Sequence, residues 1–349
     1  MISPLRNNAS RVPLALTMGD PAGIGPELAL KAWAARDADA LATFCLYGCA
    51  ATLQARAQLL GLDVPVTTIA AAGDAVGVFP DALPVIDLPV AETSIAGQPA
   101  PNNGAAVIAA ISRAVDDVKS GAAAAVVTNP IAKSVLYAAG FKHPGHTEFL
   151  AALADERWPG KVHFPVMMLA SDELKVVPLT IHVPLASVPP LISRELIATT
   201  LQITADALRR DFGIRHPRIA VAGLNPHAGE DGTIGHEERE IIGPALNAMS
   251  RDSATFIGPL SADTMFHPAA RATYDAAVCM YHDQALIPIK TLAFDKGVNV
   301  TLGLPFVRTS PDHGTAFSIA ANGTASVQSL IEALRLADRM VSARIEAHK

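Results

Sequence analysis

The sequence has few cysteines, no long apolar run and no cluster of basic residues. Its three cysteines, Cys45, Cys49 and Cys279, are an odd number in a chain of 349 residues, which predicts reduced thiols in the cytoplasm rather than a disulfide framework. Charged residues or prolines interrupt every apolar run well before the roughly 18 residues of a membrane span. The net charge of −6 argues against a nucleic-acid partner, and we expect no contact with a membrane.

Two familiar signals are also missing. The N-terminal segment MISPLRNNASRVP has no apolar stretch, so we predict no signal peptide. Neither G-x-G-x-x-G nor a Walker phosphate loop occurs. What the chain does have is a hydrophobic content of 50%, enough for a large core, and a length that predicts about two domains.

Three apolar runs, LKVVPLTIH, RIAVAGLN and AAVCM, each lead to a histidine at or just beyond their end. These histidines are His182, His227 and His282. Ligands of open α/β sheets bind outside the carboxyl ends of the strands, and three imidazoles with an open fourth position form a catalytic zinc site. A single histidine of this kind is more often hydrogen-bonded in a core or loop. The repeated context favours a metal site.

Spaced polar residues follow His282. Lys290, Asn299 and Arg308 interrupt otherwise apolar sequence, which suggests a site for a small anionic substrate. Earlier in the chain, Lys133 lies on the first turn of an expected helix, where it either faces a ligand or is solvated. His146 precedes Thr147, an expected N-cap, and could bind an anion together with the free amides of the helix start; capping alone is the alternative.

Strand and helix patterns alternate along the chain, which predicts parallel α/β layers. A glycine-rich turn, residues 19–25, follows the first expected strand and is either an anion-binding loop or a tight connection. Residues 80–101 are rich in proline and are expected to be irregular. Asp263 precedes another expected helix, either as its N-cap or as a carboxylate near the metal.

Taken together, long motifs in the chain resemble the 4-hydroxythreonine-4-phosphate dehydrogenases of vitamin B6 biosynthesis. The motifs are GDPAGIGPE, TNPIAK, GHTEFLA, HVPL, LNPHAGEDG, GPLSADTMF, YHDQALIPIK and GVNVTLGLPFVRTSPDHGTAF. The resemblance implies an α/β fold of the isocitrate/isopropylmalate dehydrogenase-like type, with two α/β/α domains around a central cleft. Residues 13–140 and 295–349 would form the domain with the nucleotide loop. Residues 141–294 would carry the metal ligands and the dimer interface.

The resemblance also implies roles for individual residues in a homodimer whose active site is shared between the subunits. The divalent metal would be bound by His182, His227 and His282. The phosphorylated substrate would be bound by His146, Thr147, Lys290, Asn299 and Arg308. The dinucleotide would be bound along Asp312, His313, Gly314, Thr315 and Ala316. Asp263 and Lys133 are the candidate catalytic residues, although a metal-bound water is a further candidate base. Asp283 and Glu230 are candidates for orienting the imidazoles.

One segment departs from the family pattern. The family usually reads GTAFDIAG, whereas Ser318 here replaces the carboxylate and Ala321 the last glycine. This segment is expected to lie beside the adenosine of the dinucleotide. Loss of its carboxylate weakens a hydrogen-bonded preference for NAD, so the choice between NAD and NADP stays open. Zinc is the metal that we expect most, with magnesium or cobalt as alternatives, because imidazole ligands suit several cations.

The implied reaction is the NAD-dependent oxidation of 4-phosphooxy-L-threonine to 2-amino-3-oxo-4-phosphooxybutanoate, which decarboxylates to 3-amino-2-oxopropyl phosphate. A related dehydrogenase of threonate or erythronate 4-phosphate, or of an aromatic dihydrodiol, is the alternative. A metallohydrolase that uses zinc hydroxide is a less favoured alternative. It would cleave a phosphate or acyl group without any nucleotide, so NAD dependence would exclude it. A metal-binding protein without catalytic activity is least favoured.

Overall fold

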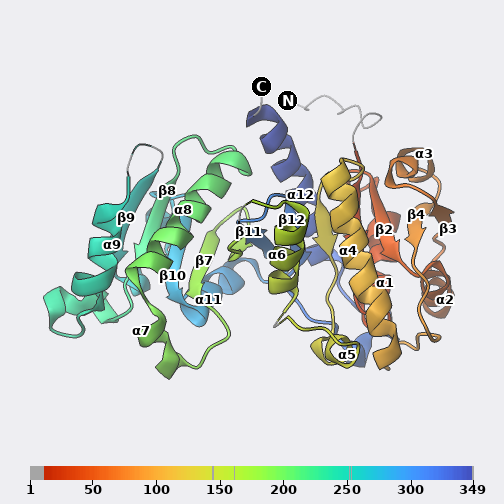
Figure 1. The fold of residues 1–349 in the computed structure, drawn as a ribbon, viewed down its shortest axis with the longest axis horizontal. Coiled ribbons are helices and arrows are strands. Elements are labelled where there is room, and N and C mark those ends of the chain that lie inside the picture. The colour runs from red at the N-terminus through yellow and green to blue at the C-terminus, as the bar shows by residue number, and fades with distance from the viewer. Residues whose placement is uncertain (1–11, 144, 161, 251, 253, 348–349) are drawn as a thin grey trace. The chain divides into compact units, whose positions relative to one another are not determined.

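The computed structural model describes residues 12–143, 145–160, 162–250, 252 and 254–347. These residues form two compact units (Figure 1). The first contains the described residues up to His163 together with Leu304–Val341, and the second contains Phe164–Gly303 together with the described residues from Ser342 onward. The predicted domains, 13–140 plus 295–349 and 141–294, differ from these units over residues 141–163 and 295–303 and in the described residues from Ser342 onward.

Within its described residues the first unit has six parallel strands in the order β3-β4-β2-β1-β5-β12. The strands are β1 (Leu14–Thr17), β2 (Phe44–Gly48), β3 (Val66–Ile69), β4 (Leu83–Asp87), β5 (Val126–Thr128) and β12 (Arg308–Pro311). Strands β1 and β2 are buried along their whole length, as expected for parallel strands that helices cover on both faces.

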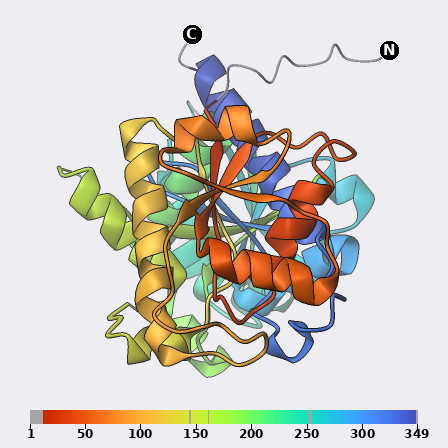
Figure 2. The same ribbon diagram turned by 90° about the vertical axis from the view of Figure 1, so that its right-hand side faces the viewer.

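Helices cover both faces of this sheet. They are α1 (Gly25–Ala34), α2 (Ala50–Leu60), α3 (Ala75–Val78), α4 (Gly104–Ser120), α5 (Lys133–Ala138), α6 (His146–Arg157) and α12 (Gln328–Ala347), the last of which extends past the boundary at residue 341. Figure 2 shows α4, in yellow, on one side of the red strands and α1, in red, on the other. Helix α6 belongs to this unit because Phe149, Leu150 and Leu153 pack into its hydrophobic core.

One prediction about this unit is wrong. Residues 80–101 were expected to be irregular, yet they contain β4, which pairs in parallel with both β2 and β3. The strand includes Pro84, a residue that usually argues against a central strand because it lacks an N–H donor. Tertiary pairing of the buried residues Leu83, Val85 and Ile86 outweighs that local signal.

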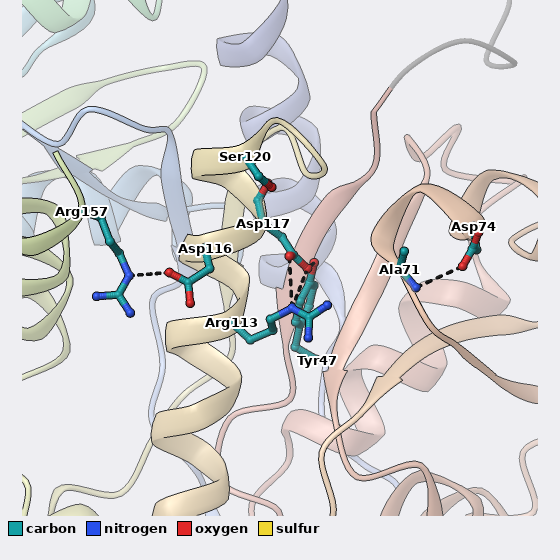
Figure 3. A network of polar contacts seen from close by, with 8 residues as sticks. All are labelled: Tyr47, Ala71, Asp74, Arg113, Asp116, Asp117, Ser120 and Arg157. Carbon is teal, nitrogen blue, oxygen red and sulfur yellow. Dashed lines mark hydrogen bonds and ion pairs between the residues drawn. The ribbon is translucent and has the colours of Figure 1, made fainter.

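Polar contacts attach α4 to its neighbours within the first unit (Figure 3). The hydroxyl of Tyr47, on β2, donates to Asp117 Oδ2 at 2.8 Å, and Arg113 Nε donates to the same carboxylate at 3.1 Å. The preceding residue of α4, Asp116, forms an ion pair with Arg157 of α6. Burial is the main cause that raises the pKa of Tyr47 above its ordinary value, so its hydroxyl keeps the proton that it donates.

The second unit is a mixed sheet. Among its described residues the strand order is β11-β6-β7-β10-β8-β9, with antiparallel pairing around β6 and parallel pairing from β7 to β9. The strands are β6 (Val166–Ala170), β7 (Lys175–Thr180), β8 (Arg218–Ala222), β9 (Thr255–Leu260), β10 (Ala276–Tyr281) and β11 (Val298–Leu302). Strands β6 and β7 form an antiparallel hairpin.

The helices of the second unit include one π-helical turn. They are α7 (Val188–Leu191), α8 (Arg194–Arg210), the π-helical turn η6 (Glu238–Ile242), α9 (Gly243–Ala248), α10 (Pro268–Arg271) and α11 (His282–Ala293). The core of this unit lies between α11 and strands β7, β8 and β10, and includes Val176, Ala220, Cys279 and Ile289. No helix in the described part of the chain is long and apolar enough to cross a membrane.

Candidate active site

The three predicted metal-binding histidines follow three strands that are neighbours in the second unit. Strand β10 pairs in parallel with β7 on one side and with β8 on the other. His182 lies two residues beyond the end of β7, His282 directly follows β10, and His227 lies in the loop after β8. Because the carboxyl ends of parallel strands meet at one edge of a sheet, the three segments begin at the same edge.

Two of these imidazoles lie close together. The ring centroids of His182 and His282 are 5.7 Å apart, and both rings line a cavity of about 230 Å³. Two imidazoles bound to one tetrahedral zinc at about 2.0–2.1 Å would have ring centroids roughly 5 Å apart. The spacing of this pair therefore suits a shared cation. Tyr281, Asp283 and Thr180 also line the cavity.

Asp283 orients one of the two rings. His282 Nδ1 lies 2.7 Å from Asp283 Oδ1, and with an ionised carboxylate the Nδ1–H donates. This hydrogen bond leaves the Nε2 lone pair of His282 available to a cation. The expectation that Asp283 supports an imidazole therefore agrees with the geometry.

His227 lies on an exposed loop, the helical turn η5 (Pro226–Gly232). In the described part of the chain, no three His, Cys, Asp or Glu side chains gather closely enough to hold a metal. The structure thus brings together His182 and His282 but does not group His227 with them in the single chain. The three-histidine site stays a prediction, and it was made for a homodimer that shares ligands.

Asp263 and Glu230 lie near the same sheet edge. Asp263 is exposed in the short turn η7 (Ala262–Thr264), which packs against η5. It is not an N-cap, because Ser261 holds that position, so the capping alternative is wrong. Glu230 is exposed within η5 itself. In the same unit Lys290, near the end of α11, and Asn299, on β11, are both half-buried.

The first unit contains a buried arginine next to a histidine with a buried ring nitrogen. Arg308, the first residue of β12, is only 4% exposed, and its Nη2 donates to Thr128 Oγ1 at 2.7 Å. Burial lowers the pKa of Arg308 to about 10, so the guanidinium stays charged at neutral pH. Burial, and then the charge of Arg308, lower the pKa of His146 well below its ordinary value. His146 is therefore neutral at pH 7, and its buried Nε2 has no hydrogen-bond partner in the structure.

Helix α6 begins at this histidine. Its N-cap is Gly145 and His146 is its first residue, so the prediction of Thr147 as the N-cap is wrong. The physical reason is the extended backbone of Gly145, which places Thr147 within the first turn instead. Lys133, the first residue of α5, brings its Nζ to 3.8 Å from the point where a Gly145 side chain would begin. The carboxylate of Glu148 lies closer, with Oε2 2.8 Å from the same point, so this helix start already faces one anionic group of the chain.

The predicted dinucleotide loop packs against the glycine-rich turn of the first unit. Thr315 O accepts a hydrogen bond from Ile24 N at 3.0 Å, and a side chain on Gly23 would come within 2.9 Å of the same oxygen. Gly23 is therefore needed for this close approach. Within the predicted loop, His313 Nδ1 contacts Gly314 O at 3.1 Å, while its Nε2 is buried and has no partner.

Asp312 and Ala316 are the two ends of the predicted dinucleotide loop. The backbone N–H of Asp312 donates to Ser329 Oγ at 3.3 Å, and Ala316 has a left-handed backbone with φ of 45°. Ser318, which replaces the family carboxylate, is exposed in the turn η8 (Phe317–Ile319). Ala321 is exposed as well.

Two charged residues that hold these loops were not anticipated from the sequence. Arg56, on α2, is 3% exposed and donates to the carbonyl oxygens of Gly23 and Pro21 at 2.8 and 3.2 Å. Glu238, on η6, is 6% exposed and accepts hydrogen bonds from Asn225. Arg56 is the one charged residue of α2, and this isolated position was the sequence signal that could have pointed to it. Glu238 stands in the run EERE, which reads as a solvated face.

Comparisons with known proteins identify the family of the chain. Residues 40–337 match the family model described as pyridoxal phosphate biosynthetic protein PdxA. A 4-hydroxythreonine-4-phosphate dehydrogenase of Bradyrhizobium diazoefficiens is 54% identical over 348 residues, which cover 97% of this chain and 100% of the relative. The crystal structure of a protein of the same name from Klebsiella pneumoniae has a TM-score of 0.84 at 38% identity, covering 95% of this chain and 100% of that one.

A second kind of dehydrogenase has the same architecture. The crystal structure of a terephthalate 1,2-cis-dihydrodiol dehydrogenase from Burkholderia xenovorans matches with a TM-score of 0.64 at 28% identity. The match covers 94% of this chain and 98% of that one. The expected isocitrate dehydrogenase-like α/β fold is thereby confirmed.

Proposed function

Because the chain belongs to the PdxA family of pyridoxal phosphate biosynthetic proteins, we propose that it is a 4-hydroxythreonine-4-phosphate dehydrogenase. It oxidises 4-phosphooxy-L-threonine with NAD to 2-amino-3-oxo-4-phosphooxybutanoate, which loses carbon dioxide to give 3-amino-2-oxopropyl phosphate. A cytoplasmic location accords with the three cysteines, which are all buried and free. The observation that carries the proposal is the pair of facing imidazoles, His182 and His282, beside a cavity in a chain with this family match.

A divalent cation is part of the proposal. His182, His227 and His282 would hold it, zinc before cobalt or magnesium, and His227 would reach it in the homodimer. The spacing of the first two rings and the hydrogen bond from His282 to Asp283 fit such a ligand set. The cation would supply Lewis acidity that lowers the pKa of the substrate alcohol.

Substrate recognition is assigned to the cationic groups. Arg308 can bind a phosphate or carboxylate in bidentate fashion, and its burial strengthens that interaction. The neutral His146 can donate its Nε2–H to the same anion, since this atom has no protein partner. Thr147 offers a hydroxyl and a free backbone amide on the first turn of α6. Lys290 and Asn299 complete the proposed set.

The proton of the substrate hydroxyl needs an acceptor when C3 loses its hydride. Lys133 and Asp263 are the two side chains assigned to this step, and both are exposed and therefore reachable. NAD, bound along residues 312–316, would take the hydride. Arg308 and Lys290 would keep the anionic groups in place while the carbon–carbon bond to the carboxylate breaks.

A homodimer that shares the site is supported by exposed apolar side chains of the second unit. Leu185, which lines the cavity, is 67% exposed, and Ile287 and Phe294 at α11 are 63% and 75% exposed. Where such side chains form a contiguous patch, they mark an interface with a partner. Mixing two impaired variants, His227→Ala and Arg308→Ala, should restore part of the activity lost at low substrate concentration if each mixed dimer retains one intact site. No recovery in verified mixed dimers would count against a shared site.

The direct test is formation of NADH from 4-phosphooxy-L-threonine with and without a chelator. We expect activity that the chelator abolishes and that zinc or cobalt restores. His227→Ala should lower metal content and turnover together, and full activity of metal-stripped His227→Ala would refute the metal role. Arg308→Ala should raise the KM for the phosphorylated substrate far more than the KM for NAD. An equal change in both would remove Arg308 from the substrate site.

A second candidate function keeps the chemistry but changes the substrate. The fold match to a terephthalate dihydrodiol dehydrogenase favours including aromatic cis-dihydrodiols, together with threonate and erythronate 4-phosphates, in a substrate panel. The buried Arg308 favours an anionic substrate, which includes both phosphate esters and a dihydrodiol that carries carboxylates, so the substrate panel has to separate the two. Turnover of a phosphate ester or acyl group without any nucleotide would instead indicate a metallohydrolase.

A further inference from the structure

The loop that carries His227 has an unusual backbone. Five consecutive residues, from His227 to Asp231, have positive φ values of 52°, 53°, 80°, 43° and 55°. Only Gly229 among them is a glycine. A non-glycine residue in the left-handed region brings its Cβ too close to the following carbonyl oxygen, so a turn of this kind persists only where its surroundings hold it.

A buried carboxylate holds the start of this turn. Glu238 Oε1 accepts a hydrogen bond from the backbone N–H of Asn225 at 2.7 Å, and Oε2 accepts one from Asn225 Nδ2 at 3.0 Å. The two oxygens thus fix both the backbone and the side chain of the residue that immediately precedes Pro226 and the turn. Asn225 O in turn accepts from Ala228 N at 3.1 Å, which connects the clamp to the left-handed residues.

The backbone of the loop encloses the Glu238 carboxylate. A Cβ on Gly223 would lie 2.9 Å from Glu238 Oε1, and a Cβ on Gly229 would lie 2.6 Å from Oε2. A Cβ on Gly235 would overlap the Asn225 amide. The loop therefore has glycines at the points where it meets Glu238 and Asn225. The Glu238 carboxylate fits between Gly223 and Gly229 because neither residue has a side chain.

Glu238 is also the first residue of the π-helical turn η6. Single π turns are rare and often occur at functional sites. We propose that Glu238 is a positioning residue that, through Asn225, holds the left-handed turn and thereby presents His227 to its cation. This inference rests on the proposed role of His227 as a metal ligand, and it adds the device that fixes where that ligand lies.

The test uses the full-length chain freed of metal and loaded with Co²⁺. The affinity for Co²⁺ is measured by competition with a chelator, and the visible absorption of the bound ion reports its ligand geometry. We expect Glu238→Gln to weaken binding by at least about tenfold and to change the spectrum, as loss of a supporting hydrogen bond typically does. Glu238→Ala should weaken binding more. Hydrogen exchange at residues 224–232 should accelerate in both variants.

Two controls separate positioning from general stability. Glu240→Gln changes an exposed carboxylate of the same turn and should leave Co²⁺ affinity unchanged. Val166→Ala removes buried volume from β6, a strand without site residues, and should lower the melting temperature while leaving the cobalt spectrum intact. Loss of affinity in Val166→Ala equal to that in Glu238→Gln would overturn the positioning role.

The outcomes also distinguish this inference from the proposed function. If His227→Ala binds Co²⁺ as tightly as the unchanged chain, the metal role of His227 is wrong and the inference is overturned with it. If His227→Ala loses affinity while both Glu238 variants keep it and keep the spectrum, only the positioning role is overturned. Parallel losses in His227→Ala, Glu238→Gln and Glu238→Ala support both.

Discussion

The two units each place a loop directly after a parallel strand, and opposite chemistry holds the two loops. In the first unit a donor, Arg56, binds carbonyl oxygens of the turn at residues 19–25. In the second unit an acceptor, Glu238, binds N–H groups of Asn225 ahead of the left-handed turn. Both charged side chains are almost fully buried and reach their loop from a helix.

The two loops also differ in which residues take a positive φ and in where a side chain would overlap neighbouring backbone. Gly19, Gly23 and Gly25 lie where a side chain would overlap neighbouring backbone, and only Gly19 among them has a positive φ. In the second unit, residues with side chains, including His227 and Ala228, take the left-handed conformation themselves. The first loop is thus fixed mainly by close packing, whereas the second is held in a strained conformation by its hydrogen bonds.

The largest effect that we predict tests the close packing of the first loop. In Gly25→Ala the new Cβ would overlap Met18 O, and backbone cannot move aside as a flexible side chain can. We expect the free energy of unfolding to fall by about 3 kcal/mol or more. The matched control is Gly77→Ala, where a Cβ meets no atom within 4 Å. Chemical denaturation measures both, and a neutral Gly25→Ala would contradict the packing account.

Removal of the donor should have the next largest effect. Arg56→Ala leaves the carbonyl oxygens of Pro21 and Gly23 without their buried partner, which should cost about 2–3 kcal/mol. Because the same turn contacts Thr315, the KM for NAD should rise more than the KM for the phosphorylated substrate. Arg56→Lys should recover part of the lost stability and part of the increase in the KM for NAD. A normal KM for NAD in a destabilised Arg56→Ala would separate the turn from dinucleotide binding.

The sequence predicted the sheet edge better than it predicted the loops on it. The apolar runs before His182 and His282 correctly placed both imidazoles at strand ends, because burial on both faces of a parallel strand leaves a clear pattern. The left-handed turn at His227 left no such signal, since its φ values are imposed by tertiary contacts. For the same reason Glu238, in a run of charges, gave no sign that it is buried.

Local rules also failed where tertiary contacts decided the outcome. Thr147 has the side chain of a good N-cap, yet the N-cap is Gly145, two residues earlier, and the helix begins at His146. Pro84 indicated irregular structure, yet pairing on both sides of β4 makes it a strand. The spacing of Lys290 and Asn299 suggested a site for an anionic substrate, and the family resemblance then assigned individual roles to them and to Asp263. These roles remain predictions.

A smaller effect concerns a carboxylate in the first loop. Burial raises the pKa of Asp20 above its ordinary value, against the lowering effect of the hydrogen bond from Ala22 N. A raised folded-state pKa means that its contribution to stability is complete below the unfolded pKa of about 3.9 and declines as pH rises through the folded value. Asp20→Asn should therefore be more stable than the unchanged chain at pH 7, by up to about 1 kcal/mol.

The difference between Asp20→Asn and the unchanged chain should shrink as pH falls toward 4, because both side chains are then neutral. Urea denaturation between pH 4 and 8 measures it. Asp211 of the second unit provides a contrast, since the hydrogen bonds from Arg210 and Arg344 outweigh burial and lower its pKa. Asp211→Asn should lose stability at pH 7 and approach the unchanged chain in acid. A constant difference for Asp20→Asn would contradict the burial argument.

The smallest predicted effect tests the strain in the second loop. Ala228 has φ of 53°, which glycine adopts without the steric cost that alanine bears. Part of this gain is offset because glycine makes the unfolded chain more flexible, so Ala228→Gly should stabilise the protein by only about 0.5 kcal/mol. In a Glu238→Ala background the gain should disappear, because the turn is no longer held in the left-handed conformation. An equal gain in both backgrounds, measured by denaturation, would show that the turn keeps its shape without Glu238.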